Sequence, residues 1–254
     1  MHSNDDGSHR LSVSIASMTS AAAKSAKGRS EIILLRGLGC TASVWRPLMT
    51  HLEGRGMTCR APTLQADYRP LVVKNPSAPA IDLAEFASEV RSLCKASRSR
   101  TGRSPVVIGH SMGGLLAQVI AAEGLCSKAI FLAPASPRAV PNRSPWMIFC
   151  FANVLLSRDT TCFQKAWRTG ARITLLHRLP EPRQEVVYDT MVFEPGQLFA
   201  DKAKGMDIAA DAFRLPTLTV AAGPDRQAYG GVLFSVVRDH QAPNLPAIQP
   251  LADR

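Results

Sequence analysis

The segment VVIGHSMGGLLAQVIAAEG, residues 106–124, places a serine between two glycines, after a short apolar run and before a longer one. The first run predicts a buried strand and the second predicts a helix. The glycines around Ser111 remove side chains where the strand and the helix must turn sharply. Such a turn exposes a hydroxyl at the N-terminus of a helix. Ser111 is therefore a candidate nucleophile, and it needs a neighbouring base to take its proton.

Apolar and amphipathic runs alternate on both sides of this serine. Strands are expected at 31–37, 57–64, 105–109, 128–136 and 215–225, and helices at 41–56, 80–96 and 112–124. This alternation predicts an α/β fold with a mainly parallel sheet and helices on both faces. A further short strand is expected within residues 232–237. The basic stretch KASRSRTGRS, residues 95–104, is interpreted as a solvated loop between a helix and a strand.

The alternation stops at Pro137 and resumes near residue 206. Residues 137–205 contain helices and loops, and we interpret them as a helical lid insertion over the carboxyl edge of the sheet. The core is then formed by residues 29–136 and 206–254. Residues 1–28, rich in Ser and Ala, are expected to be a disordered tail. We expect the carboxyl-terminal end of the core to be atypical or truncated, because the link after residue 222 is too short for an ordinary helical crossover.

The motif GHSMGG, residues 109–114, matches the nucleophile elbow of the α/β-hydrolase fold family. The chain resembles the serine esterase and lipase-like branch of that family. Residues 34–56 look like the family's stretch after its third strand, where a His-Gly pair shapes the oxyanion pocket. This chain has Arg36-Gly37 there instead. The resemblance implies an oxyanion hole made by the backbone N–H groups of Leu38 and Met112.

The family order of the catalytic triad is serine, acid and histidine. Asp225 is the one well-placed acid, because it follows a predicted strand through a short Gly-Pro turn. His240 is the only histidine after Asp225, and it follows the candidate last strand. It is therefore the candidate base, although a surface-loop histidine is the competing interpretation. His177, inside the insertion, would be the base only if the chain order were rearranged.

Most aromatic residues of the chain lie in the insertion. Trp146 and Phe149 are the candidate substrate-binding residues, because aromatic side chains over such a site would line an apolar pocket. They could equally form a small core of the insertion itself. The expected function is a serine hydrolase that cleaves carboxylic esters or thioesters with apolar groups through an acyl-enzyme on Ser111. The alternatives are an acyltransferase of the same fold, or a catalytically impaired hydrolase-like protein that binds an apolar ligand.

The composition limits the classes of partner that the chain is expected to bind. A formal net charge of +10 could attract polyanions, but the basic residues are spread along the 254 residues, so no nucleic-acid partner is expected. No apolar run reaches the ~20 residues of a membrane span. None of the six cysteines stands in a metal-binding pattern, so we expect free thiols, a cytoplasmic location, and neither a metal nor a cofactor. The substrate is expected to be a small apolar ester or acyl compound, and the oligomeric state stays open.

Overall fold

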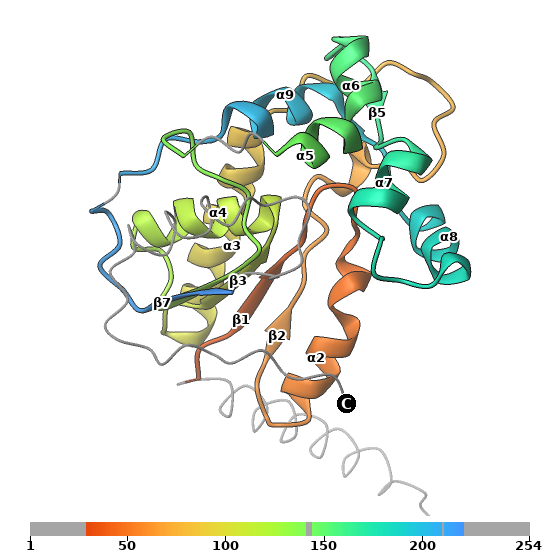
Figure 1. The fold of residues 1–254 in the computed structure, drawn as a ribbon. Coiled ribbons are helices and arrows are strands. Elements are labelled where there is room, and N and C mark those ends of the chain that lie inside the picture. Colours follow the sequence, from red (N-terminus) through yellow and green to blue (C-terminus); the bar gives the residue numbers. More distant parts are fainter. Residues whose placement is uncertain (1–28, 141–143, 210, 221–254) are drawn as a thin grey trace, which may run out of the picture.

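A computed structural model describes residues 29–140, 144–209 and 211–220 of the chain. Its main sheet has the order β2-β1-β3-β4-β7, with every neighbouring pair parallel (Figure 1). The strands are β1 (Ile32–Leu35), β2 (Cys59–Arg60), β3 (Val106–His110), β4 (Lys128–Leu132) and β7 (Thr217–Val220). The chain runs outward from β1 to β2 and then returns to place β3 on the other side of β1. The crevice outside the carboxyl ends of β1 and β3 is the place where such sheets bind ligands.

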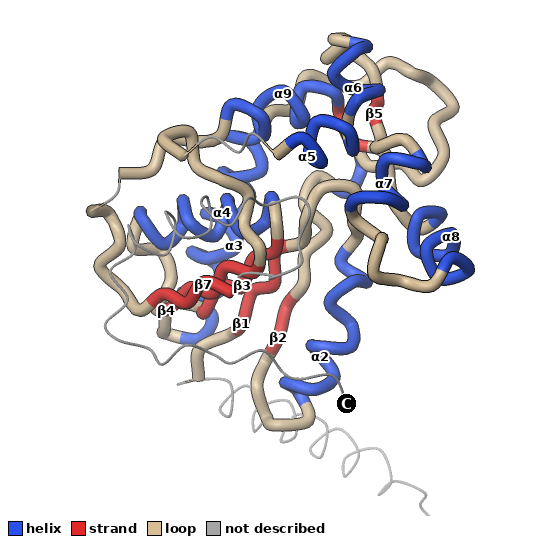
Figure 2. The backbone as a smooth tube through the Cα atoms, in the orientation of Figure 1, coloured by secondary structure: helices blue, strands red, loops and turns tan. Residues whose placement is uncertain are grey.

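Helices cover both faces of this sheet, so the predicted fold class is confirmed. The 3-10 helix η1 (Ala42–Trp45) and α2 (Arg46–Glu53) lie on one face, while α3 (Leu83–Thr101) and α4 (Met112–Ala122) lie on the other (Figure 2). A second 3-10 helix, η2 (Ala66–Tyr68), follows β2. All four residues of β1 are buried, as expected for a strand with packing on both sides.

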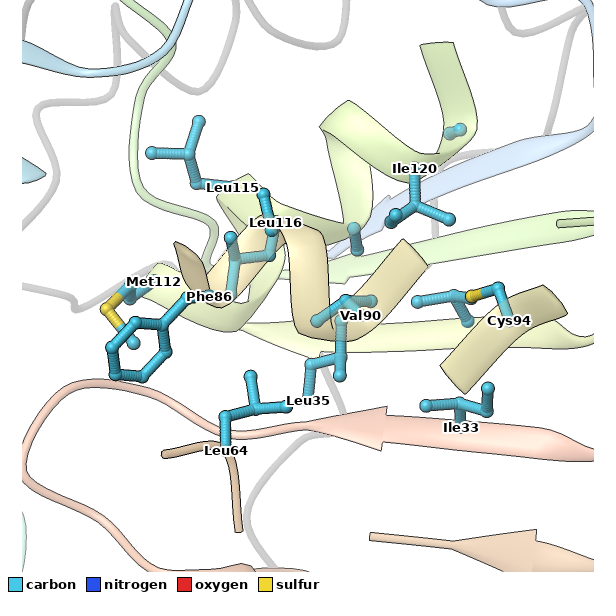
Figure 3. Close-up of a cluster of buried hydrophobic side chains, with 14 of the residues drawn as sticks. Ile33, Leu35, Leu64, Phe86, Val90, Cys94, Met112, Leu115, Leu116 and Ile120 are labelled. Atoms are coloured by element: carbon cyan, nitrogen blue, oxygen red, sulfur yellow. The ribbon is translucent and has the colours of Figure 1, made fainter. Parts of the chain in front are cut away.

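The main core lies between the sheet and the pair α3–α4 (Figure 3). Ile33 and Leu35 of β1 point to this side, and Phe86 and Val90 of α3 pack with them at 0% exposure. The alternate residues of β1, Ile32 and Leu34, join Trp45 in a smaller cluster on the opposite face. The two-residue period of a strand thus divides one short run between two cores.

The structure corrects the interpretation of residues 95–104 as a loop. The helix α3 continues to Thr101 and ends at Gly102, which adopts the left-handed conformation with φ +76°. Cys94, Ser97 and Thr101 are buried one helical turn apart, so this face still packs on the core. The start of α3 is fixed by a capping box, in which Asp82 accepts from the Glu85 N–H and Glu85 accepts from the Asp82 N–H.

Between β4 and β7 the chain forms a cluster of short helices at one end of the sheet (Figure 1). They are α5 (Pro145–Cys150), α6 (Ala152–Ser157), α7 (Arg168–Thr174), α8 (Glu181–Asp189) and α9 (Gly196–Lys204). The segment also contains a two-stranded antiparallel pair, β5 (Phe163–Gln164) and β6 (Glu194–Pro195), where the sequence predicted no strand. The helix α9 anchors the cluster, because Leu198 is fully buried in the main core.

The core between the sheet and α3 generates a stability prediction. Phe86→Ala should lower the free energy of unfolding by roughly 3–5 kcal/mol, because it leaves a cavity among fully buried side chains. Leu156→Ala is the control, since Leu156 is 82% exposed and its truncation should change stability by less than about 0.5 kcal/mol. Urea unfolding followed by circular dichroism measures both. Equal stability losses in the two variants would contradict the core described above.

Candidate active site

Ser111 lies in the sharp turn between β3 and α4. Its backbone has φ +52° and ψ −118°, an unusual conformation for a residue with a side chain. The turn is tied to the neighbouring strand and its loop: the Ser111 N–H donates to the Leu132 carbonyl at 3.1 Å, and the Ser111 carbonyl accepts from Ala135 N–H at 2.8 Å. A strained conformation held from both sides keeps the hydroxyl in one place.

Two glycines make this turn possible. A Cβ on Gly109 would lie 2.1 Å from the Gly113 carbonyl oxygen, and one on Gly113 would lie 2.2 Å from the Leu35 carbonyl oxygen. Any other residue at these positions would push β1, β3 and α4 apart. The sequence pattern around Ser111 therefore serves close backbone packing, as the turn requires.

Ser111 lines a cavity of about 410 Å³ between the sheet and the helix cluster. Its walls include Gly37, Leu38 and Cys40 after β1, and Ala133 and Pro134 after β4. The helix cluster contributes an apolar side, from residues that lie on α5, α7, α8, α9 and the segments between them: Met147, Phe151, Leu175, Leu176, Val187, Met191 and Phe199. The serine thus faces a largely apolar space, and its hydroxyl has no hydrogen-bond partner among the described residues.

The predicted oxyanion donors lie beside this cavity. Leu38 is one of its lining residues, and Met112 is the first residue of α4, next to Ser111. In the part of the chain that the structure describes, neither the Leu38 N–H nor the Met112 N–H donates to an acceptor. Unpaired N–H groups at the start of a helix attract negative charge.

The candidate acid and base, Asp225 and His240, lie outside the described residues. The strand that precedes Asp225 is β7, which pairs with β4, and Ala133 N–H donates to the Val220 carbonyl at 2.8 Å. Because the strands are parallel, the chain after Val220 leaves the sheet at the edge where Ser111 lies.

Other imidazoles line the cavity within the described chain. His110 precedes Ser111, and its ring lies close to Gly37, where a Cβ would be 3.1 Å from Nδ1. His177 follows α7, and its Nδ1 lies 2.9 Å from the Thr174 carbonyl oxygen. A carbonyl only accepts, so this contact requires a proton on Nδ1 and leaves Nε2 as the acceptor nitrogen. His51 is remote from the cavity, since it is exposed on α2 and contacts Arg55.

A buried ionic cluster holds the loop that carries Leu38. The Glu194 carboxylate of β6 accepts from Arg36 Nη1 at 3.1 Å, from Arg69 Nε at 2.7 Å and from the Gly39 N–H at 2.7 Å. Arg69 also contacts Glu194 through Nη2, which donates to the Cys40 carbonyl as well. All three side chains are at most 1% exposed.

This cluster explains how arginine replaces the histidine expected after β1. Arg36 Nη1 donates to the Gly37 carbonyl at 2.7 Å, so the guanidinium braces the loop itself. Burial lowers the pKa of Arg36 from 12.5 to about 10, while the charge of Glu194 acts in the opposite direction. Arg36 is therefore cationic at neutral pH, and Glu194 is the counter-ion that makes its burial tolerable. Sequence reasoning flagged Arg36 but missed Arg69 and Glu194, because 158 positions separate Arg36 from its carboxylate.

The two predicted substrate-binding aromatics do not line this cavity. Trp146 is 42% exposed, and Phe149 packs edge-to-face against Trp167 with ring centroids 5.2 Å apart. The cavity is lined instead by Met147 of α5 and by Phe151, which follows this helix. Tertiary packing fixes the rotation of α5, and the assignment of Trp146 and Phe149 to substrate binding stays a prediction.

The model of the α/β hydrolase family matches residues 32–253. The chain belongs to the α/β hydrolase family. No curated protein sequence matches the chain significantly. Among solved structures, an Arabidopsis methylesterase shares 15% identity and a TM-score of 0.62, over 84% of this chain and 86% of that one. An extracellular α/β-hydrolase from a Paenibacillus species has 14% identity and a TM-score of 0.61, over 82% and 86% of the two chains.

A third similar structure, polyneuridine aldehyde esterase, has 14% identity and a TM-score of 0.59, over 85% of this chain and 88% of that one. At such identities the similarity establishes the fold of this hydrolase-family chain and no more. No helix of the described residues is long and apolar enough to cross a membrane.

The ionic cluster generates the second prediction. Glu194→Gln should lower the free energy of unfolding by roughly 3–5 kcal/mol, because two buried guanidinium groups lose the one counter-ion that they have among the described residues. Glu185→Gln is the matched control, because its partners Arg168 and Arg172 are 49% and 33% exposed and each such pair contributes about 0–1 kcal/mol. Urea unfolding of the two variants tests this difference. The stabilising role of Glu194 is wrong if both variants unfold at the same urea concentration.

Proposed function

We propose that this chain is a serine hydrolase that cleaves carboxylic esters or thioesters with apolar groups. The observation that carries the proposal is the strained turn at Ser111, which presents to an apolar cavity a hydroxyl that has no hydrogen-bond partner among the described residues. Ser111 attacks the carbonyl carbon, a base takes the hydroxyl proton, and the alcohol or thiol leaves with a proton. Water then cleaves the acyl-enzyme. The esterase names of two similar structures agree with this class of substrate.

The backbone donors beside Ser111 support the same chemistry. A tetrahedral intermediate carries a negative oxygen, and the donors that we assign to it are the N–H groups of Leu38 and Met112, which are unpaired within the part of the chain that the structure describes. Leu38 belongs to the loop that Arg36 and Glu194 hold in place. Such a loop changes little during the reaction, which is what oxyanion stabilisation requires.

For the base we propose His240, oriented by Asp225, and for residues 137–205 the role of a lid. The position of β7 supports an acid at residue 225, because the chain leaves this strand at the edge that carries Ser111. His177 is the competing base, since it lines the cavity and its Nε2 is the acceptor nitrogen. The lid assignment is supported by the side chains that the helix cluster contributes to the Ser111 cavity.

Loss of the nucleophile is the first test of this function. Ser111→Ala should abolish labelling by a fluorophosphonate probe and hydrolysis of 4-nitrophenyl hexanoate, because no other hydroxyl would take its place. Gel fluorescence and release of 4-nitrophenolate measure the two. Ser136→Ala, which changes another serine near this edge, is the control and should keep the labelling. Undiminished labelling of Ser111→Ala would remove this serine as the nucleophile.

The base is tested by comparing two histidine variants. His240→Ala should lower kcat by about the same factor as Ser111→Ala, because triad members act as a unit. His177→Ala should change kcat by less than roughly tenfold, as expected for a residue that only lines the pocket. Steady-state kinetics on 4-nitrophenyl hexanoate measures both. The reverse pattern would move the base to His177 and leave Ser111 as the nucleophile.

A further inference from the structure

Lys202 lies where two cavities meet. It is one of the residues lining the Ser111 cavity, and it also lines a second cavity of about 360 Å³ beneath α5, α6 and α9. The residues common to both cavities are otherwise apolar: Ala135, Met147, Phe151 and Phe199. A cation in a wall of this composition needs an explanation, because burial of an unpaired charge is costly.

The ammonium group of Lys202 has only weak partners in the described chain. Its Nζ lies 3.1 Å from the Met147 sulfur and 5.3 Å from the centre of the Phe151 ring. A thioether is a weak acceptor, and a ring face offers only a cation–π contact. No carboxylate of the described residues forms an ion pair with Lys202. Within the described chain, two of its three N–H donors have no partner and the third meets only the weakly accepting sulfur, so the ammonium can bind a ligand.

The charged side chains near Lys202 in the described chain do not form an ion pair with it. Asp201, the adjacent residue of α9, accepts from the Leu83 N–H and from Gln197, and lies 3.9 Å from Lys204. Asp159, which lines the second cavity, accepts from Thr161 and Cys162. Arg158 also lines that cavity.

Lys202 differs from the other lysine that lines the Ser111 cavity in the acceptors that its ammonium group contacts. The other lysine of this cavity, Lys165, donates to the Met191 carbonyl at 2.7 Å and lies over the Tyr188 ring. Its ammonium thus has a strong acceptor of its own. Among the described residues, the other titratable side chains that line this cavity are His110, His177, Cys40 and Arg178, and none of them is a carboxylate.

We propose that Lys202 binds a carboxylate of the substrate and so selects esters or thioesters that carry an anionic group at the end of an apolar chain. This inference rests on the proposed function at Ser111 and names its substrate class. The reacting carbonyl lies at Ser111, the apolar chain passes Met147 and Phe151, and the free carboxylate pairs with Lys202. Half-esters of dicarboxylic acids have this chemistry. A single ammonium in apolar surroundings matches a monoanion better than a phosphate dianion.

The test compares two esters of equal chain length. The anionic substrate is mono-4-nitrophenyl adipate and the neutral one is 4-nitrophenyl hexanoate; the adipate chain is long enough to avoid attack by its own carboxylate. Lys202→Met should lower kcat/KM for the adipate roughly 10- to 100-fold, the usual range for loss of a charged hydrogen bond, and leave hexanoate hydrolysis largely unchanged. Lys165→Met is the matched control and should change the ratio of the two kcat/KM values far less.

The ratio of the kcat/KM value for the adipate to that for the hexanoate should also change with pH in a defined direction. Burial lowers the pKa of Lys202 from 10.5 to about 8, with the Cys150 thiol acting in the opposite direction. Lys202 is thus cationic below about pH 8 and neutral above it. The preference for the adipate should be largest near pH 7 and should decline as the pH rises through 8 and above. Taking the ratio cancels the titration of the catalytic base, which both substrates share.

Two outcomes of the comparison between the two nitrophenyl esters overturn the inference. One is an unchanged ratio of the two kcat/KM values in Lys202→Met, and the other is an equal loss of kcat/KM on both substrates, which would place Lys202 in the reaction itself or in folding.

A separate measurement distinguishes failure of the inference from failure of the proposed function. Calorimetric binding of monomethyl adipate to Ser111→Ala should weaken roughly 10- to 100-fold when Lys202→Met is added, whereas dimethyl adipate should bind both proteins equally. Equal binding of the monoester to both proteins also overturns the inference, even if the protein hydrolyses neither nitrophenyl ester.

Discussion

The buried contact between Arg36, Arg69 and Glu194 joins three parts of the chain that are far apart in sequence. Arg36 follows β1, Arg69 follows η2, and Glu194 lies in β6, within the segment that forms the helix cluster. Charges at most 1% exposed are tolerated only when each has a partner, so these three segments have to stay together. Because Glu194 also accepts from the Gly39 N–H, the same contact fixes the loop that lines the cavity around Ser111. The ionic cluster thus couples the helix cluster to the floor of the candidate active site.

Backbone packing imposes a second constraint on this site. The turn at Ser111 brings α4 so close to β1 and β3 that a side chain at Gly109 or Gly113 would overlap main-chain atoms. The positive φ of Ser111 is stable because the turn is bonded to β4 and its loop. Below this turn, Met112, Leu115 and Leu116 are fully buried in the main core. The hydroxyl of Ser111 is therefore held by a turn that rests on the main core, whereas the cavity above it is lined by the loops after β1 and β4 and by the helix cluster.

The helix cluster divides its side chains between two tasks. Cys150, Ala166 and Ala171 form a small core of its own, and Leu198 joins the main core. Met147, Phe151 and Phe199 instead face the cavity, with Phe151 and Phe199 in edge-to-face contact at 5.5 Å. Lys202 is the exception in this apolar wall, because its ammonium lies against a sulfur and a ring. We infer that residues at the edge of the sheet carry out the reaction and that residues of the helix cluster select the substrate.

The sequence by itself determined the parts of this protein that depend on local periodicity and turn chemistry. The alternation of strands and helices, the parallel sheet and the exposed turn at Ser111 follow from runs of neighbouring residues. The tertiary structure alone decided which distant residues meet, since local patterns carry no information on such pairs. Glu194 finds Arg36 across 158 positions, Lys202 reaches the Ser111 cavity from a separate helix, and the rotation of α5 places Met147, and not Trp146, at that cavity. Within the predicted loop at residues 95–104, the part up to Thr101 proved to be helix for the same reason, because burial of Ser97 and Thr101 against the core outweighed its polar composition.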